Sequence, residues 1–285
     1  MSKNLITRII VAAITIPIIL WICYQGGAWL FGMVMLFALL AISEFLINEG
    51  HRPGSFYFWF GLLAVAFLVL SRYEAASTWF WVQFLFSGVS GILVVFLISG
   101  MIFATGKEPP AELFTRHSRL VWGVFYIGLL YPYVYLLGNQ YSQLADLQVA
   151  GGDWLLFLFG VLWVGDTAAM GFGKWIGKHK LAPGVSPNKT VEGFVGGIVG
   201  ALLIGVIMYF WKFNRLEWYH VLVLAGGCSV FGQVGDLVES MWKRSIGIKD
   251  SSPLIPGHGG VLDRFDSLLF AAPFMFFYRL LIIVS

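Results

Sequence analysis

Long apolar runs, each of about the length that crosses a lipid bilayer, constrain this 285-residue chain more than any other feature. The hydrocarbon core of a bilayer is about 30 Å thick, and about 20 residues of helix span it. Nine such runs, bounded by polar or Gly/Pro-rich segments, cover residues 5–24, 28–47, 56–71, 79–103, 119–138, 152–173, 191–211, 219–241 and 266–284. The sequence therefore predicts an all-α polytopic integral membrane protein with about nine transmembrane helices.

Composition supports this fold class and excludes several functions. Hydrophobic residues make up 59% of the chain and charged residues 12%, whereas soluble domains have roughly 45–50% and about 25%. Such a chain is neither a soluble globular domain nor a disordered segment. Its low charge also excludes a basic nucleic-acid-binding protein, so we expect no nucleic-acid partner.

The distribution of Lys and Arg predicts the orientation. Cytoplasmic loops of membrane proteins carry the positive excess. With nine spans and a cytoplasmic N-terminus, 14 of the 18 Lys and Arg residues fall on the cytoplasmic side and 4 on the other. We therefore expect the N-terminus in the cytoplasm.

Polar residues concentrate in the second half of the chain. Residues 1–150 form about five spans whose acids lie near loops, and residues 151–285 form about four spans with two long polar loops, both cytoplasmic in this topology. We predict an N-terminal transmembrane region at 1–150 and a C-terminal catalytic region at 151–285, with its site at the cytoplasmic boundary of the membrane.

The first polar region runs from the sixth span to residue 193. Asp166 lies inside that span, where a charged group costs at least about 2.5–3.5 kcal/mol and needs a partner or a function. In the loop, Lys189 and Thr190 precede a predicted helix N-terminus, a place that favours anions. A structural bond between helices is the alternative for Asp166, and attraction to anionic lipid heads is the alternative for Lys174, Lys178 and Lys180.

The second polar region begins in the eighth span. On a helix, two carboxylates, a hydroxyl and an ammonium group share one face there: Asp236, Glu239, Ser240 and Lys243. Asp263 and Asp266 repeat the i, i+3 spacing near the ninth span. Bare carboxylates in such numbers repel one another, and hard oxygen ligands suit Mg²⁺, so we predict one or two bound cations. Ion pairing with Lys243, Arg244 and Arg264 is the alternative.

A glycine-rich segment, P-G-H-G-G at residues 256–260, separates the two acidic pairs. Glycine lets backbone N–H groups approach a phosphate closely, and His258 can donate to a phosphate oxygen. The segment follows Lys243, Arg244 and Lys249 in the chain. Together these residues predict a phosphate-binding site.

The stretch from Ser240 to Asp266, S-M-W-K-R-(4)-K-D-S-S-(3)-P-G-H-G-G-V-L-D-R-F-D, closely resembles the signature of the phosphatidate cytidylyltransferases, the CDP-diacylglycerol synthases. The stretches W-x-x-D-T-A-A around Asp166 and S-P-N-K-T-V-E-G at 186–193 also resemble sequences of this family. The resemblance implies that CTP and phosphatidate react to CDP-diacylglycerol and pyrophosphate with Mg²⁺, in the inner membrane of a bacterium.

This resemblance and the residue chemistry together suggest a role for each candidate. The candidates for catalysis are Asp236, Lys243, Arg244, Lys249, Asp263 and Asp266. The candidates for substrate binding are Ser186, Lys189, Thr190, Glu192, Ser240, His258, Gly259, Gly260 and Arg264. The candidates for Mg²⁺ or a second cation are Asp236, Asp263, Asp266, Glu239 and Asp166.

Other functions and an assembly state stay open at this point. Intramembrane carboxylates also mark ion pathways, as in a cation-coupled transporter, but here they cluster toward one side of the membrane. Two further alternatives are closer to the activity that the resemblance implies: a related enzyme with another lipid acceptor, and a lipid kinase that uses CTP. A face of small residues would suit a homodimer, which nothing in the sequence selects.

Overall fold

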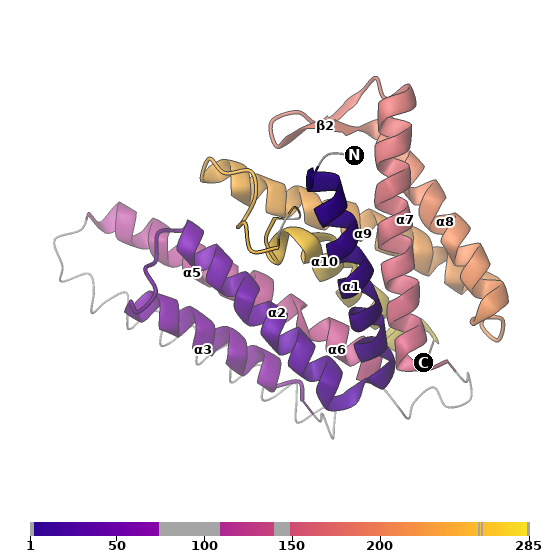
Figure 1. Cartoon of the computed structure of the whole chain (residues 1–285), viewed down its shortest axis with the longest axis horizontal. Helices are drawn as coiled ribbons and strands as arrows, with labels where there is room; N and C mark the ends of the chain where they lie inside the picture. Colours follow the sequence, from indigo (N-terminus) through magenta and orange to yellow (C-terminus); the bar gives the residue numbers. More distant parts are fainter. Residues whose placement is uncertain (1–2, 74–108, 140–148, 256, 258, 284–285) are drawn as a thin grey trace. The chain divides into compact units, whose positions relative to one another are not determined.

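The computed structural model describes residues 3–73, 109–139, 149–255, 257 and 259–283 (Figure 1). Within them, six helices are long and apolar enough to cross a membrane: Gly27–Asn48, Pro110–Asn139, Gly151–Ile176, Val191–Trp211, Trp218–Ser245 and Leu262–Ile283. The chain is therefore a helical integral membrane protein. Residues 9–25 and 56–70 form shorter apolar helices. The predicted span at 79–103 lies outside the described residues, so the count of nine stays a prediction.

The described elements follow the predicted order. They are α1 (Lys3–Gln25), α2 (Gly27–Asn48), α3 (Phe56–Leu70), α5 (Pro110–Leu130), α6 (Pro132–Asn139), α7 (Gly151–Ile176), β1 (Lys180–Ala182), β2 (Ser186–Thr190), α8 (Val191–Trp211), α9 (Trp218–Ser245), α10 (Leu262–Tyr278) and the π-helical turn η2 (Arg279–Ile283). Helix α8 coincides with the predicted span 191–211. Helix α9 runs past the predicted end at 241, and α10 begins before the predicted start at 266. Hydropathy misses these ends because polar turns continue the helices beyond the apolar runs.

The chain divides into two compact units. One contains Met1–Leu30 and Tyr133–Ser285, and the other contains Phe31–Pro132. In the second unit, α3 packs against α5, and the hydroxyl of Tyr57 lies 3.3 Å from Nε2 of His117. All residues of the candidate site belong to the first unit. The functional division at residue 150 stays a prediction.

Small residues bring α7 and α8 into close contact, side by side along much of their length (Figure 1). A Cβ atom on Gly200 would lie 2.6 Å from the Cβ of Ala168, and one on Gly196 would lie 2.5 Å from the Cβ of Phe172. Small residues are typical of helix contacts in membranes because they let two backbones approach. This packing fixes Asp166, on α7, relative to the start of α8.

The polar loop after α7 folds into a hairpin that the sequence analysis did not predict. Strands β1 and β2 are antiparallel, with Lys180 opposite Thr190 and Ala182 opposite Ser186. Within the described residues this is the one sheet, so the all-α prediction holds for the membrane-spanning part. The strands are too short to show an alternating pattern, which explains why they were missed.

Helices α9 and α10 touch at Gly235, next to a candidate site residue. A Cβ on Gly235 would lie 2.5 Å from the backbone oxygen of Asp266. Backbone atoms cannot move away as the end of a flexible side chain can. Glycine at this position therefore sets the spacing between the helix that carries Asp236 and the helix that carries Asp263 and Asp266.

We expect Gly235→Ala to lower the free energy of unfolding by about 1–3 kcal/mol, because the methyl group forces α10 away from α9. Turnover should fall as well, since α10 carries candidate site residues. Gly226→Ala is the matched control on α9, because its nearest neighbour, Leu202 Cδ2, would lie 3.8 Å from the new Cβ. Thermal unfolding in detergent compares the two, and equal midpoints would contradict the assigned spacing role.

Candidate active site

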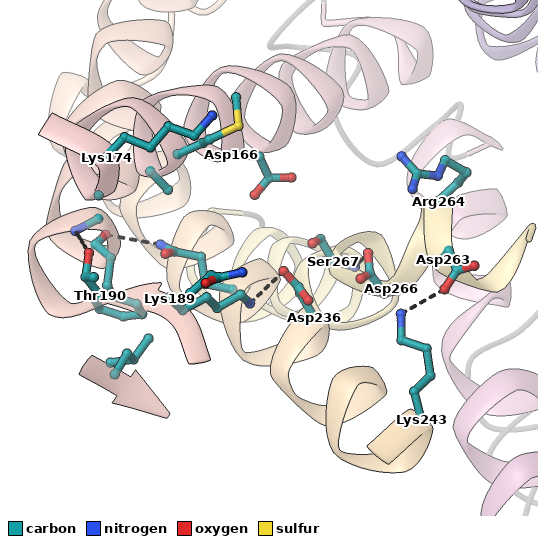
Figure 2. A pocket seen from close by; sticks show the side chains of 18 of the residues that line it. Asp166, Lys174, Lys189, Thr190, Asp236, Lys243, Asp263, Arg264, Asp266 and Ser267 are labelled. Carbon is teal, nitrogen blue, oxygen red and sulfur yellow. Dashed lines mark hydrogen bonds and ion pairs between the residues drawn. The ribbon is translucent and has the colours of Figure 1, made fainter. Parts of the chain in front are cut away.

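A cavity of about 660 Å³ lies between α7, α9, α10 and the hairpin (Figure 2). Nine of its 19 lining residues are charged, although only 12% of the chain is. They are five carboxylates and four cations: Asp166, Asp236, Asp250, Asp263, Asp266, Lys174, Lys189, Lys243 and Arg264. Such a mixed set suits a polyanionic ligand that binds together with a metal cation.

The hairpin carries Lys189 into this cavity. Lys189 is the last residue before Thr190, whose hydroxyl accepts a hydrogen bond from the backbone N–H of Gly193 (3.1 Å) and so caps α8. The ammonium of Lys189 lies 2.6 Å from Oδ2 of Asp236 on α9 (Figure 2). The hydroxyl of Ser240, one turn further along α9, donates to Oδ1 of Asp236 at 3.2 Å. Asp236 thus holds the hairpin lysine against the helix.

Glu192 fixes the base of the hairpin. Its carboxylate accepts a hydrogen bond from the backbone N–H of Lys178 (3.0 Å), and Oε1 lies 2.6 Å from Nδ1 of His179. Glu192 stands in the first turn of α8, so these contacts join the start of that helix to the chain entering β1. The structure places Glu192 outside the cavity, beside the hairpin.

Lys243 joins the two acidic pairs that the spacing predicted. Its ammonium lies 3.1 Å from Oε2 of Glu239, one turn away on α9, and 2.8 Å from Oδ1 of Asp263 on α10. The Glu239 side chain is 0% exposed and that of Lys243 is 12% exposed. A buried charge needs a partner of opposite sign. Lys243 therefore neutralises carboxylates on two helices at once.

Asp263 also holds the loop between α9 and α10. Its Oδ2 accepts hydrogen bonds from the backbone N–H and the hydroxyl of Ser251 (2.8 and 3.1 Å) and from the backbone N–H of Gly260 (2.8 Å). Gly259 has a φ of +83°, and a Cβ there would lie 2.7 Å from this same oxygen. The glycines of the predicted phosphate-binding segment thus let the loop close on Asp263.

Three carboxylates on three helices face the cavity and interact through their charges: Asp166, Asp236 and Asp266. Asp166 makes no hydrogen bond or ion pair with any other residue that the structure describes. These oxygens are of the kind that Mg²⁺ prefers. Within the described residues, however, no three His, Cys, Asp or Glu side chains are already arranged as a metal site. The donor set fits such a cation in its chemistry.

The cavity brings together eight of the residues that the sequence singled out: Asp166, Lys189, Thr190, Asp236, Lys243, Asp263, Arg264 and Asp266. Other candidates do not line it: Ser186, Glu192, Glu239, Ser240, Arg244, Lys249, Gly259 and Gly260. Arg244 instead donates from Nη1 to the backbone oxygen of Ile248 (2.8 Å) and so closes the end of α9. His258 lies outside the described residues.

Sequence reasoning missed four residues that line the cavity, Asn188, Gln233, Asp250 and Ser267, and it weighed a fifth, Lys174, only within the basic run of the loop. Helical spacing could have indicated two of them. Lys174 follows Asp166 by two helical turns, and Gln233 precedes Asp236 by three residues, so each shares a helix face with a candidate.

The fold and the cavity define a polytopic membrane protein with a cavity lined by five carboxylates and four cationic side chains. The model of the cytidylyltransferase family matches residues 6–282, and the chain belongs to this family. Proteins named phosphatidate cytidylyltransferase from Staphylococcus haemolyticus, Staphylococcus epidermidis and Staphylococcus aureus are each 34% identical to it. Each alignment covers 96% of this chain and 97% of the relative.

Proposed function

We propose that this protein transfers the cytidylyl group of CTP to phosphatidate, giving CDP-diacylglycerol and pyrophosphate. The observation that carries the proposal is the cavity itself, in which carboxylates and cations from three helices and a hairpin converge on one space in a membrane-embedded chain. Family membership and the names of the relatives support the donor and the acceptor.

In the proposed reaction, a phosphate oxygen of phosphatidate attacks the α-phosphorus of CTP. A new P–O bond forms there as the bond to the β-phosphate oxygen breaks, and pyrophosphate leaves with that electron pair. A phosphate monoester is largely dianionic at neutral pH, so the attacking oxygen arrives without its proton. The protein therefore needs no strong general base.

The chief task of the site is to bring several negative charges together. The cationic side chains of Lys189, Lys243 and Arg264 line the cavity and would bind phosphate oxygens, which stabilises the charge that develops on pyrophosphate. Asp166, Asp236 and Asp266 would hold Mg²⁺, which when bound neutralises phosphate charge and polarises the reacting phosphorus. Both substrates can then occupy one cavity without mutual repulsion.

We also propose the finer topology given by the positive-charge distribution. It has nine spans, a cytoplasmic N-terminus and the cavity at the cytoplasmic boundary of a bacterial inner membrane. CTP would then reach the site from the cytosol while phosphatidate keeps its acyl chains in the inner leaflet. The distribution of Lys and Arg supports the orientation, and the six candidate spans support the membrane embedding. A homodimer stays open.

The test is an assay of purified protein in detergent with phosphatidate, Mg²⁺ and CTP labelled at the α-phosphate. We expect label in the organic phase together with an equal amount of pyrophosphate in the aqueous phase. A lipid kinase would release CDP and leave the α-label in water, and a transporter would form no product. Turnover only with a different lipid phosphate would reassign the acceptor.

A further inference from the structure

The cavity has two cationic sides separated by its carboxylates. On one side Lys174 extends from α7, near the hairpin, and on the other Arg264 extends from α10 (Figure 2). In this view Asp236 and Asp266 lie between them. A reaction between two anionic substrates needs two such sides, and the residues around each one differ.

The α7 side adjoins apolar surface. Met170 lines the cavity, and its side chain is 56% exposed. Trp175, directly after Lys174, is 80% exposed. Exposed Trp at the end of a membrane helix is typical of the depth of lipid headgroups, and a neighbouring Lys extends its ammonium to the same depth. Lys174 therefore lies where a lipid phosphate would meet the cavity.

The α10 side has polar surroundings. Arg264 follows Asp263, which binds the loop through Ser251 and Gly260. Asp250, in the same loop, also lines the cavity. A nucleotide fits this polar side. A substrate with two acyl chains does not, because moving each methylene from lipid to water costs about 0.8 kcal/mol.

From this asymmetry we propose that Lys174 binds the phosphate of the lipid acceptor, with an acyl chain lying against Met170, while the Arg264 side receives the nucleotide. The assignment rests on the proposed function and divides its site between the two substrates. Asp166, Met170 and Lys174 are spaced at i, i+4 and i+8 and so form one face of α7. Long side chains on a helix lean toward its N-terminus, which directs Lys174 over Met170 toward Asp166.

The charge of Lys174 is available to an incoming anion. In the part of the chain that the structure describes, its side chain makes no ion pair, whereas Lys189 pairs with Asp236 and Lys243 pairs with Glu239 and Asp263. A lipid phosphate can therefore bind Lys174 without breaking an existing bond. The other two lysines contribute to holding the cavity together.

The first experiment compares Lys174→Ala with Lys178→Ala, a matched control from the same basic run whose side chain does not line the cavity. We expect Lys174→Ala to raise the KM for phosphatidate about tenfold, the effect of losing one charge-assisted contact, with less than a twofold change in the KM for CTP. Lys178→Ala should change neither, and Lys174→Arg should retain most of the affinity. A rise in the KM for CTP alone would overturn the assignment.

The second experiment tests the acyl-chain contact with Met170→Gln, which keeps the length of the side chain. We expect a higher KM for long-chain phosphatidate and an unchanged KM for dihexanoyl phosphatidate, whose chains are too short to lie along α7. An equal effect on both lipids, or none on either, would contradict the contact.

A binding measurement separates this inference from the proposed function. Dihexanoyl phosphatidate should stabilise the wild-type protein against thermal unfolding in detergent. The apparent Kd for this lipid should be about tenfold higher in Lys174→Ala than in the wild type. If the wild type shows this binding but forms no CDP-diacylglycerol, the function is wrong and the phosphate site stands. If it forms the product and Lys174→Ala leaves both the KM and the Kd for phosphatidate unchanged, the site is wrong and the function stands.

Discussion

Replacing Asp236 by asparagine is expected to lower kcat/KM by about a thousandfold or more, equivalent to roughly 4 kcal/mol of transition-state stabilisation. The carboxylate of Asp236 lies 2.6 Å from the ammonium of the hairpin residue Lys189, and Asp236 is one of the five carboxylates that line the cavity. Asparagine keeps the shape of the side chain but removes its charge. The substitution therefore weakens both the hold on Lys189 and the proposed cation site.

The measurement is turnover of CTP and phosphatidate over a range of Mg²⁺ concentrations. The matched control is Glu217→Gln, which removes an exposed carboxylate at the opposite end of the same helix and should leave turnover within about twofold of wild type. A near-normal rate of Asp236→Asn at limiting Mg²⁺ would contradict the assigned role.

Lys243→Met is expected to destabilise the protein as well as inactivate it. The ammonium of Lys243 neutralises Glu239, which is fully buried, and also contacts Asp263. Removing one member of a buried ion pair typically costs about 3–5 kcal/mol because it leaves a charge without a partner. We expect the midpoint of thermal unfolding in detergent to fall by roughly 10 °C.

A double variant separates the two effects of Lys243. In Glu239→Gln/Lys243→Met both charges are removed, so much of the stability should return, since neutral replacement of a buried pair is often tolerated. Asp263 can remain charged in this variant because Ser251 and Gly260 still donate to it. Activity should stay low, because Lys243 lines the cavity and is proposed to bind phosphate. Recovery of full activity would exclude a role for Lys243 in the reaction.

Local spacing predicted the helical part of the site well. The predicted shared face is confirmed by two bonds along α9, one from Ser240 to Asp236 and one from Lys243 to Glu239. The sequence also indicated that acids of the eighth and ninth spans converge, and Lys243 joins them. Both results follow from helix periodicity, which fixes which side chains face the same way whatever the rest of the fold does.

The spacing of residues along a helix could not predict the contacts that loops make. The pairing of Lys189 with Asp236 depends on a hairpin whose two strands are three and five residues long. Lys174 is a different case, because it lies on α7 two helical turns after Asp166 and spacing could have indicated it. The sequence weighed Lys174 only with other loop lysines, as part of the positive charge on the cytoplasmic side. Its position on α7 distinguishes it from Lys178, which follows the end of that helix and does not line the cavity.

The glycine contacts between helices imply a division between fixed and adaptable parts of the site. Where α7 meets α8 at Gly200 and α9 meets α10 at Gly235, the nearest neighbours are the Cβ of Ala168 and the backbone oxygen of Asp266, and neither atom can move away by a change of rotamer. The walls that carry Asp166, Asp236 and Asp266 therefore form a rigid frame. Adjustment to ligands of different size falls to the hairpin, which reaches the opposite wall through the flexible side chain of Lys189. Variation in substrate preference among related chains should accordingly arise in the hairpin before it arises in the helices.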